Sequence, residues 1–253
     1  MPPFPTDTWF FAAAIPAVLL MGLAKGGFSG LGLLAMMLMS LVVSPVRAAA
    51  IMLPILVVQD AVTVWAYRKS FDRRLLLIML PGTLAGVGLG WAVAAQVSED
   101  VVRLMVGLIS IGFVALFWRP RAAPAAAARG RPAAGLFWGM VSGFTSFVAH
   151  AGGPPFQVYV MPRRLTPELY ASTSTMFFAV TNAIKLPAYL ALGQFSAENV
   201  GASAVLFPLA IVATFAGVWL VRRIEARRFY GIIYALTFIV GLKLVIDGLR
   251  GLF

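Results

Sequence analysis

Three ionisable residues lie inside apolar stretches of the chain. Lys25 comes directly before Gly26 and Gly27, and Asp60 and Lys185 each lie within a long apolar run. A charge deep in a membrane costs about 2.5–3.5 kcal/mol on insertion scales, so each is a candidate functional group. The lysines could counter the charge of an anion, unless Lys25 is an interfacial anchor or Lys185 pairs with Asp60. Asp60 could carry a proton, but we favour a counter-ion of a lysine.

Two glycine-rich breaks interrupt the shorter apolar runs. The first contains Gly26, Gly27 and Ser29, and the second runs from His150 through Gly152 and Gly153 to Pro155. A helix that restarts after a break presents unpaired N–H groups and a partial positive charge, which favours anions. Alternatively, the glycines only permit close helix crossings. The lysine beside the first break favours a binding site.

Neutral hydrogen-bonding side chains near these groups complete the candidate site. Ser29, Gln157 and Asn182 are predicted to support a bound anion. His150 is the only histidine and could titrate in the physiological range, so it joins Asp60 as a candidate for proton coupling. A lone histidine in a turn is more often a hydrogen-bonding strut. The predicted substrate-binding set is therefore Lys25, Gly26, Gly27, Ser29, His150, Gly152, Gly153, Gln157, Asn182 and Lys185.

The composition places these residues in a membrane protein. Of 253 residues, 61% are hydrophobic and 11% charged, against about 45–50% and 25% in soluble domains. Mean hydropathy is +0.92. Cysteine is absent, which excludes disulfides, iron–sulfur clusters and the usual Cys/His zinc sites. The chain also lacks paired catalytic acids. We expect no enzyme, no metal and no cofactor.

Apolar runs predict an all-α polytopic protein with about 8–10 membrane segments. Full spans of about 18–25 residues are predicted at 46–67, 75–96, 101–118, 168–192, 199–221 and 229–249. Shorter arms are predicted in two glycine-broken pairs, 8–23 with 31–43 and 133–149 with 155–161. Whether these arms cross the membrane or re-enter is left open.

The net charge of +11 is distributed as membrane orientation requires, not as a nucleic-acid-binding face. Basic residues cluster in four connections, at 68–74, 119–131, 163–164 and 222–228, which we predict to be cytoplasmic. Both termini are then predicted to lie on the outer side. The first apolar stretch follows no basic signal-peptide region, so we expect it to be retained.

This threading gives two halves of opposite orientation. Residues 1–118 and 133–253 each contain a glycine-broken helical hairpin followed by three transmembrane helices, and 119–132 is a cytoplasmic linker rich in Ala, Pro and Arg. Weak sequence matches join the halves: Ser44-Pro45 with Thr166-Pro167, Asp60 with Asn182, Tyr67 with Tyr189, Pro81 with Pro208, and Gly90 with Gly217. Two inverted repeats of this kind are typical of secondary transporters, whose substrate sites lie at discontinuous helices near the midplane.

Three segments carry a resemblance to a known family. They are 22–30 (GLAKGGFSG), 142–154 (SGFTSFVAHAGGP) and Lys185-Leu186-Pro187 with Gly193-Gln194-Phe195. With most of the chain from about Ala14 to Ile246, they resemble the sulfite exporter (TauE/SafE) family of bacterial inner-membrane proteins. The resemblance implies transport of sulfite, sulfonates or other small sulfur-containing or carboxylate anions. It supplies no catalytic residues, and many members have glycine where this chain has Lys25.

Together these observations predict a secondary transporter that exports small anions across a bacterial inner membrane. The expected partners are the anion and the lipid bilayer, with no nucleic acid. One alternative is a proton-coupled importer, and another is a non-transporting membrane sensor or assembly partner. The anion, the direction, the coupling and the oligomeric state, a homodimer included, are left open.

Overall fold

The computed structural model describes residues 8–26, 31–68, 70–94, 96–118, 131–163, 165–220 and 227–253, and these ranges contain helices and turns with no strand. The α-helices are α1 (Thr8–Gly26), α2 (Leu31–Ser40), α3 (Pro45–Tyr67), α4 (Arg73–Ala94), α5 (Glu99–Trp118), α6 (Pro132–Ala149), α7 (Gly153–Val160), α8 (Pro167–Ala191), α9 (Ala197–Leu220) and α10 (Arg227–Leu252). A short 3₁₀ helix, η1 (Met161–Arg163), follows α7. The predicted all-α polytopic class is confirmed.

Helices α3 and α8 begin with the same local device. The Ser44 side chain accepts the backbone N–H of Arg47, and the Thr166 side chain accepts that of Leu169. A proline follows each cap, where its fixed φ suits the first helical turn and its missing N–H costs nothing. The Ser-Pro and Thr-Pro pairs therefore mark true helix starts.

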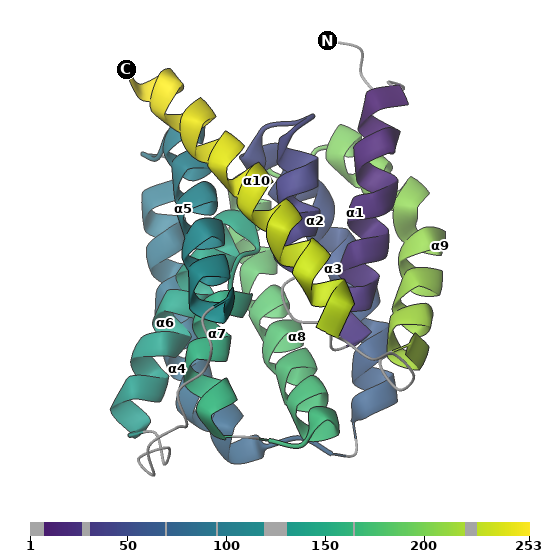
Figure 1. Ribbon diagram of the computed structural model, residues 1–253, viewed down its shortest axis with the longest axis vertical. Helices are drawn as coiled ribbons and strands as arrows, with labels where there is room; N and C mark the ends of the chain where they lie inside the picture. The colour runs from purple at the N-terminus through teal and green to yellow at the C-terminus, as the bar shows by residue number, and fades with distance from the viewer. Residues whose placement is uncertain are drawn as a thin grey trace.

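The two hairpins enter the bundle from opposite ends (Figure 1). Helix α1 runs inward from the end that also holds the end of α10, and α2 returns toward that end, whereas α6 runs inward from the other end and α7 returns toward it. Helix α1 has 19 residues and α6 has 18, enough to cross a membrane, so neither of these arms is short. Helix α1 continues to Gly26, beyond the predicted end at 23, whereas α6 matches the predicted bounds 133–149 to within one residue. Only α2 (10 residues) and α7 (8 residues) are short.

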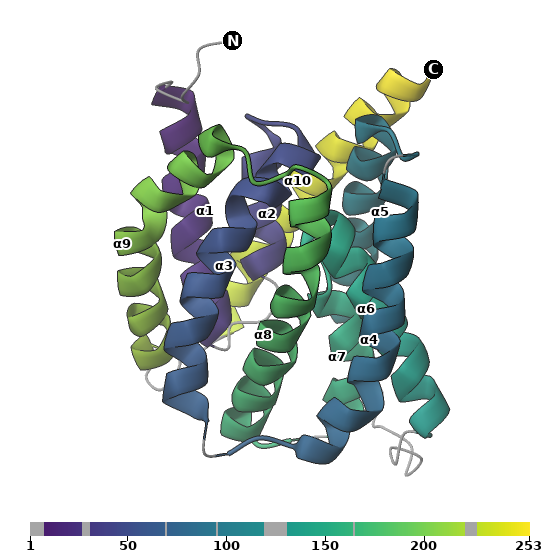
Figure 2. The same ribbon diagram turned by 180° about the vertical axis from the view of Figure 1, so that it is seen from behind.

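Each of the main helix pairs joins one helix of the first half to one helix of the second half. Helix α4 lies along α6, and α1 lies along α9, while α3 packs on α8 and α5 on α10. Both views agree on these neighbours (Figure 2). Suppose that α1–α5 correspond in order to α6–α10. The pair of α4 with α6 then corresponds to the pair of α9 with α1, and the other two pairs each correspond to themselves. An inverted repeat predicts this pattern, and the repeat itself stays a prediction.

Glycines allow two of these crossings to be very close. A Cβ atom at Gly82 or Gly86 of α4 would lie about 2 Å from a carbonyl oxygen of α6, at 1.9 and 2.0 Å respectively. Gly139 and Gly143 of α6 meet α4 at 2.2 and 2.3 Å in the same way. Small residues at i, i+4 spacing let membrane helices pack backbone to backbone. These four glycines hold the α6 hairpin against the first half.

The molecule is apolar outside and polar at its centre. Large exposed hydrophobic side chains include Trp9, Leu77, Val212, Trp219 and Ile239. Five helices, α1, α3, α4, α6 and α9, are long and apolar enough by composition to span a membrane among the described residues. Buried polar side chains instead lie on the helix faces that meet inside the bundle. The protein is therefore a multi-pass membrane protein.

Candidate functional site

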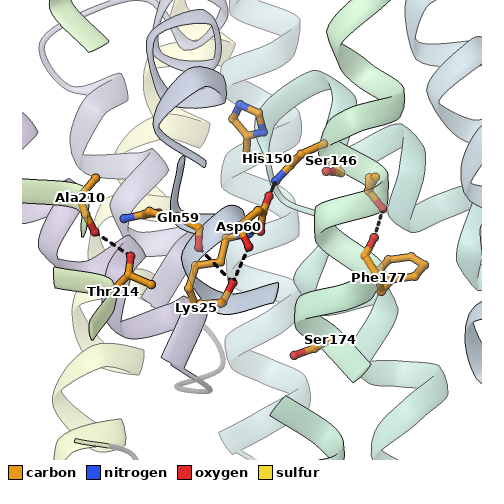
Figure 3. A network of polar contacts seen from close by, with 12 residues as sticks. Lys25, Gln59, Asp60, Ser146, His150, Ser174, Phe177, Ala210 and Thr214 are labelled. Carbon is orange, nitrogen blue, oxygen red and sulfur yellow. Dashed lines mark hydrogen bonds and ion pairs between the residues drawn. The ribbon is translucent and has the colours of Figure 1, made fainter. Parts of the chain in front are cut away.

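A buried ion pair joins the end of α1 to the middle of α3. The Lys25 ammonium contacts one carboxylate oxygen of Asp60, and both side chains are less than a tenth exposed. The second carboxylate oxygen accepts a hydrogen bond of 2.6 Å from the Asn182 amide of α8. Figure 3 shows this network close by. Both oxygens of Asp60 are thus engaged, and its observed partner is a lysine.

A second buried lysine lies beside the end of α6. The Lys185 ammonium, fully buried on α8, lies 2.7 Å from Nδ1 of His150 and 3.2 Å from both the carbonyl and the hydroxyl oxygen of Ser146. On the other side of the ring, Nε2 of His150 lies 2.9 Å from the carbonyl oxygen of Ala49. A carbonyl only accepts, so Nε2 carries the hydrogen, and Nδ1 accepts from the ammonium. In this geometry the imidazole is neutral and accepts a hydrogen bond from Lys185.

The backbone at the second break places His150 at this position. His150 caps α6 in the left-handed region (φ 51°), and its N–H bonds the carbonyl of Ser146 at 3.0 Å. The Ser142 hydroxyl then donates to the carbonyl of Gly152 at 2.8 Å. A Cβ atom at Gly152 would lie 2.8 Å from the carbonyl oxygen of Ser142, so this position requires glycine. The turn folds back on α6 and leaves the imidazole inside the bundle.

A cavity of about 110 Å³ lies between these groups. One water needs about 10–15 Å³ of such space, so the cavity has room for a small anion with some water. Polar side chains on its wall are Lys25, Ser146, His150, Gln157, Ser174, Thr175 and Asn182. Apolar and aromatic side chains on its wall are Met21, Leu33, Leu56, Pro154, Phe156, Tyr170 and Phe178.

Helix α7 brings one unsatisfied polar side chain to this wall. Gln157 is 4% exposed, and its amide oxygen has no hydrogen-bond partner. Gly153 faces open space, since the nearest atom to an added Cβ is the Gln157 amide nitrogen at 4.0 Å. The start of α7 offers fewer backbone N–H donors than predicted. Pro154 and Pro155 have no N–H, and the Phe156 N–H donates to the carbonyl of Gly152.

The predicted site residues divide into four groups. Lys25, His150, Gly153, Gln157 and Asn182 lie on the cavity wall. Lys185 and Gly152 lie behind it, in contact with Ser146, which does line it. Gly26 instead packs against Gly217 of α9, where an added Cβ would lie 2.3 Å from a backbone carbon, as the crossing interpretation requires. Gly27 and Ser29 lie outside the described residues.

One face of α8 lines the cavity with residues that were not predicted from the sequence. Tyr170, Ser174, Phe178 and Asn182 are spaced four residues apart, and all four line the cavity. Residues at i, i+4 share a helix face. The spacing from Asn182 was therefore the signal that could have identified the other three.

With both lysines protonated, the described residues at the centre carry one excess positive charge. Two lysines, Lys25 and Lys185, face one carboxylate, Asp60, while the observed hydrogen bonds make His150 neutral. Uncompensated buried charge is costly, so such a site favours an added negative charge. Among the described residues no group of three His, Asp or Glu side chains could hold a metal ion.

Comparison with known proteins gives one match. A family model described as "Sulfite exporter TauE/SafE" matches residues 14–244, nearly the whole chain. No curated protein and no solved structure matches the chain.

Proposed function

The chain belongs to the sulfite exporter TauE/SafE family, and we propose that it is a secondary transporter that exports small anions, sulfite or organic sulfonates and carboxylates, across a bacterial inner membrane. Family membership carries the coarser statement, that of a membrane transporter of anions rather than an enzyme. The substrate range, the direction and the membrane are our proposal.

The excess positive charge beside the cavity carries this proposal. Lys25 lies on the cavity wall. Lys185 lies behind the wall and is hydrogen-bonded to two residues that line it, Ser146 and His150. Neutral hydrogen-bonding groups from α6, α7 and α8 surround the same space. An anion that enters would neutralise the excess charge and exchange water for these groups. An assembly partner would need no such cavity between its two hairpins.

Export follows from the sign of the membrane potential. With the interior negative, moving one negative charge outward gains about 2.3 kcal/mol per 100 mV, equivalent to about a 50-fold gradient. An exporter of anions therefore needs no coupling ion. Import would need one, and Asp60 and His150 are the deep candidates. Both carboxylate oxygens of Asp60 and both ring nitrogens of His150 already have partners, which favours the uncoupled mechanism.

The proposed orientation rests on the basic residues. The start of α1 and the end of α10 lie at one end of the bundle, and the starts of α4, α6 and α8 lie at the other (Figure 1). Arg73 begins α4, Arg131 caps α6, and Arg163 ends η1 just before α8. Short cytoplasmic connections are enriched in Lys and Arg. We place this end in the cytoplasm and both termini outside.

Anion flux in proteoliposomes tests the proposed function. A potassium diffusion potential of either sign would be imposed, with sulfite, methanesulfonate and acetate as substrates. We expect flux driven by the potential alone, lost in Lys185→Ala and in Lys25→Ala. Lys243→Ala is the matched control, since that lysine pairs with Asp247 on an exposed face of α10. Flux that requires a pH gradient would favour the importer, and no flux with any anion would overturn the proposal.

A further inference from the structure

We propose that the cavity selects singly charged anions with a short apolar substituent and discriminates against dianions. The inference rests on the proposed function and narrows its substrate class. Both the charge balance of the centre and the distribution of hydrogen-bond donors on the wall support it.

The charge balance leaves room for one negative charge. Lys25, Asp60 and Lys185 are the charged groups that meet at the centre from α1, α3 and α8 within the described residues. Helices α6 and α7 contribute only neutral groups there, the His150 imidazole, Ser146 and Gln157. One bound monoanion brings the sum of charges to zero. A dianion would leave a negative charge without a partner among side chains that are mostly buried.

The donors of the second lysine are already in use. An ammonium group has three N–H donors, and that of Lys185 has three acceptors around it: the Ser146 carbonyl, the Ser146 hydroxyl and Nδ1 of His150. Lys185 therefore contributes its electric field but no free N–H group. Lys25 is the only described ammonium on the wall, and one of its donors goes to Asp60. A second anionic group on the substrate would find no second ammonium to bind.

One part of the wall is apolar and suits an alkyl substituent. Phe156 and Phe178 lie on it together with Leu33, Leu56 and Pro154. These side chains offer no hydrogen bond to a second charged group, and burying a charge against them is unfavourable. An alkyl group gains by the same contact. For sulfite, which exists as a monoanion and a dianion near neutral pH, the species bound is then hydrogen sulfite.

Two ligands of nearly the same shape separate charge from size. Sulfoacetate is a dianion, and sulfoacetamide is the monoanion in which an amide replaces the carboxylate. Binding of each to the purified protein would be measured by calorimetry, with ethanesulfonate as a third ligand. We expect sulfoacetamide and ethanesulfonate to bind at least about tenfold more tightly than sulfoacetate, since one unpaired buried charge costs more than a tenfold factor.

A charge change in the protein provides the second half of the test. Asp60→Asn raises the excess charge by one, so it should shift the ratio of the two affinities toward sulfoacetate by about tenfold or more. Asp247→Asn, at an exposed carboxylate of α10, is the matched control and should leave the ratio unchanged. If Asp60→Asn fails to fold, Gln157→Glu puts a carboxylate on the cavity wall, brings the excess to zero and should weaken binding of all three ligands.

The outcomes separate the inference from the proposed function. Equal or tighter binding of sulfoacetate by the wild-type protein overturns the selectivity, while anion transport still stands. An affinity ratio that Asp60→Asn does not move also overturns it. Absence of binding by all three ligands and by sulfite overturns both.

Discussion

The two helix ends that meet at the cavity use a lysine in different ways. At the end of α1 the lysine belongs to the arm itself, and Asp60 of α3 neutralises it. At the end of α6 the arm contributes His150 in a left-handed cap, and the lysine comes from α8 with no carboxylate in contact. The lysine at the end of α1 therefore has a carboxylate partner, and the lysine beside the end of α6 has none among the described residues. The difference suggests that the first lysine holds the structure together and the second attracts the anion.

Breaking the compensated pair should have the largest effect. Lys25→Met leaves the Asp60 carboxylate buried without its counter-ion, and loss of one member of a buried pair costs about 3–5 kcal/mol. Thermal unfolding in detergent should show a large fall in stability. The double variant Lys25→Met/Asp60→Asn should recover most of it, and a double variant as unstable as the single one would contradict the pair.

Removing the uncompensated lysine should separate binding from stability. Lys185→Met takes away a charge that has no carboxylate partner, so stability should stay within about 1 kcal/mol of the wild type, because the lost hydrogen bonds and the relieved desolvation oppose each other. Binding of methanesulfonate should weaken by at least about tenfold. Calorimetry and thermal unfolding measure the two effects, and a large loss of stability with unchanged binding would reverse the roles of the two lysines.

The two glycines of the second break should differ in tolerance. Gly152→Ala places a methyl group 2.8 Å from the carbonyl oxygen and side chain of its α6 neighbours, and overpacking of this kind costs about 1–3 kcal/mol. Gly153→Ala meets open space and should cost less than half as much. Because its methyl group points toward Gln157 at the cavity, it should affect anion affinity more than stability. Equal losses of stability in the two variants would show that Gly152 is not packed more closely than Gly153.

The smallest expected effect compares two tyrosines at corresponding positions. The Tyr189 hydroxyl donates to the carbonyl of Phe147 at 2.6 Å, and the Tyr67 hydroxyl donates to that of Gly26 at 3.2 Å. Tyr189 thus links α8 to α6, and Tyr67 links α3 to α1, so each hydrogen bond joins two helices of the same half. Tyr189→Phe should cost about 0.5–1.5 kcal/mol, as a single hydrogen bond does, and Tyr67→Phe should cost less. Thermal shifts in the opposite order would contradict the ranking.

Much of the fold could be predicted from the sequence, because membrane spans depend on composition and length alone. The starts of α3 and α8 were predicted from the apolar runs at 46 and 168, and they lie one residue earlier, at Pro45 and Pro167. The end of α1 was predicted too early, at 23, because Lys25 looked like an interruption of the apolar run, whereas the helix extends to Gly26. Apolarity identifies what faces lipid, not where a helix ends inside the protein.

Most residues of the candidate site could be predicted from the sequence, but which of them contact each other could not. Buried lysines, an aspartate and an asparagine draw attention because each is costly in a membrane. Which lysine meets Asp60 depends on how α1, α3 and α8 approach one another, and spacing along the chain carries no such information. Gly26 illustrates the same limit, since a glycine beside a lysine looks like a ligand site and yet faces Gly217 of another helix.

The glycine-lined crossings of α4 with α6 and of α1 with α9 also bear on how the gene could be divided. Each fragment produced by cutting the polypeptide within 119–132 would expose a groove that only the other fragment fills, at Gly82 and Gly86 in one and at Gly217 in the other. The two pieces would behave as obligate partners rather than as independent modules. Co-production should restore a complex from them, and either piece made alone should be cleared by cellular proteases.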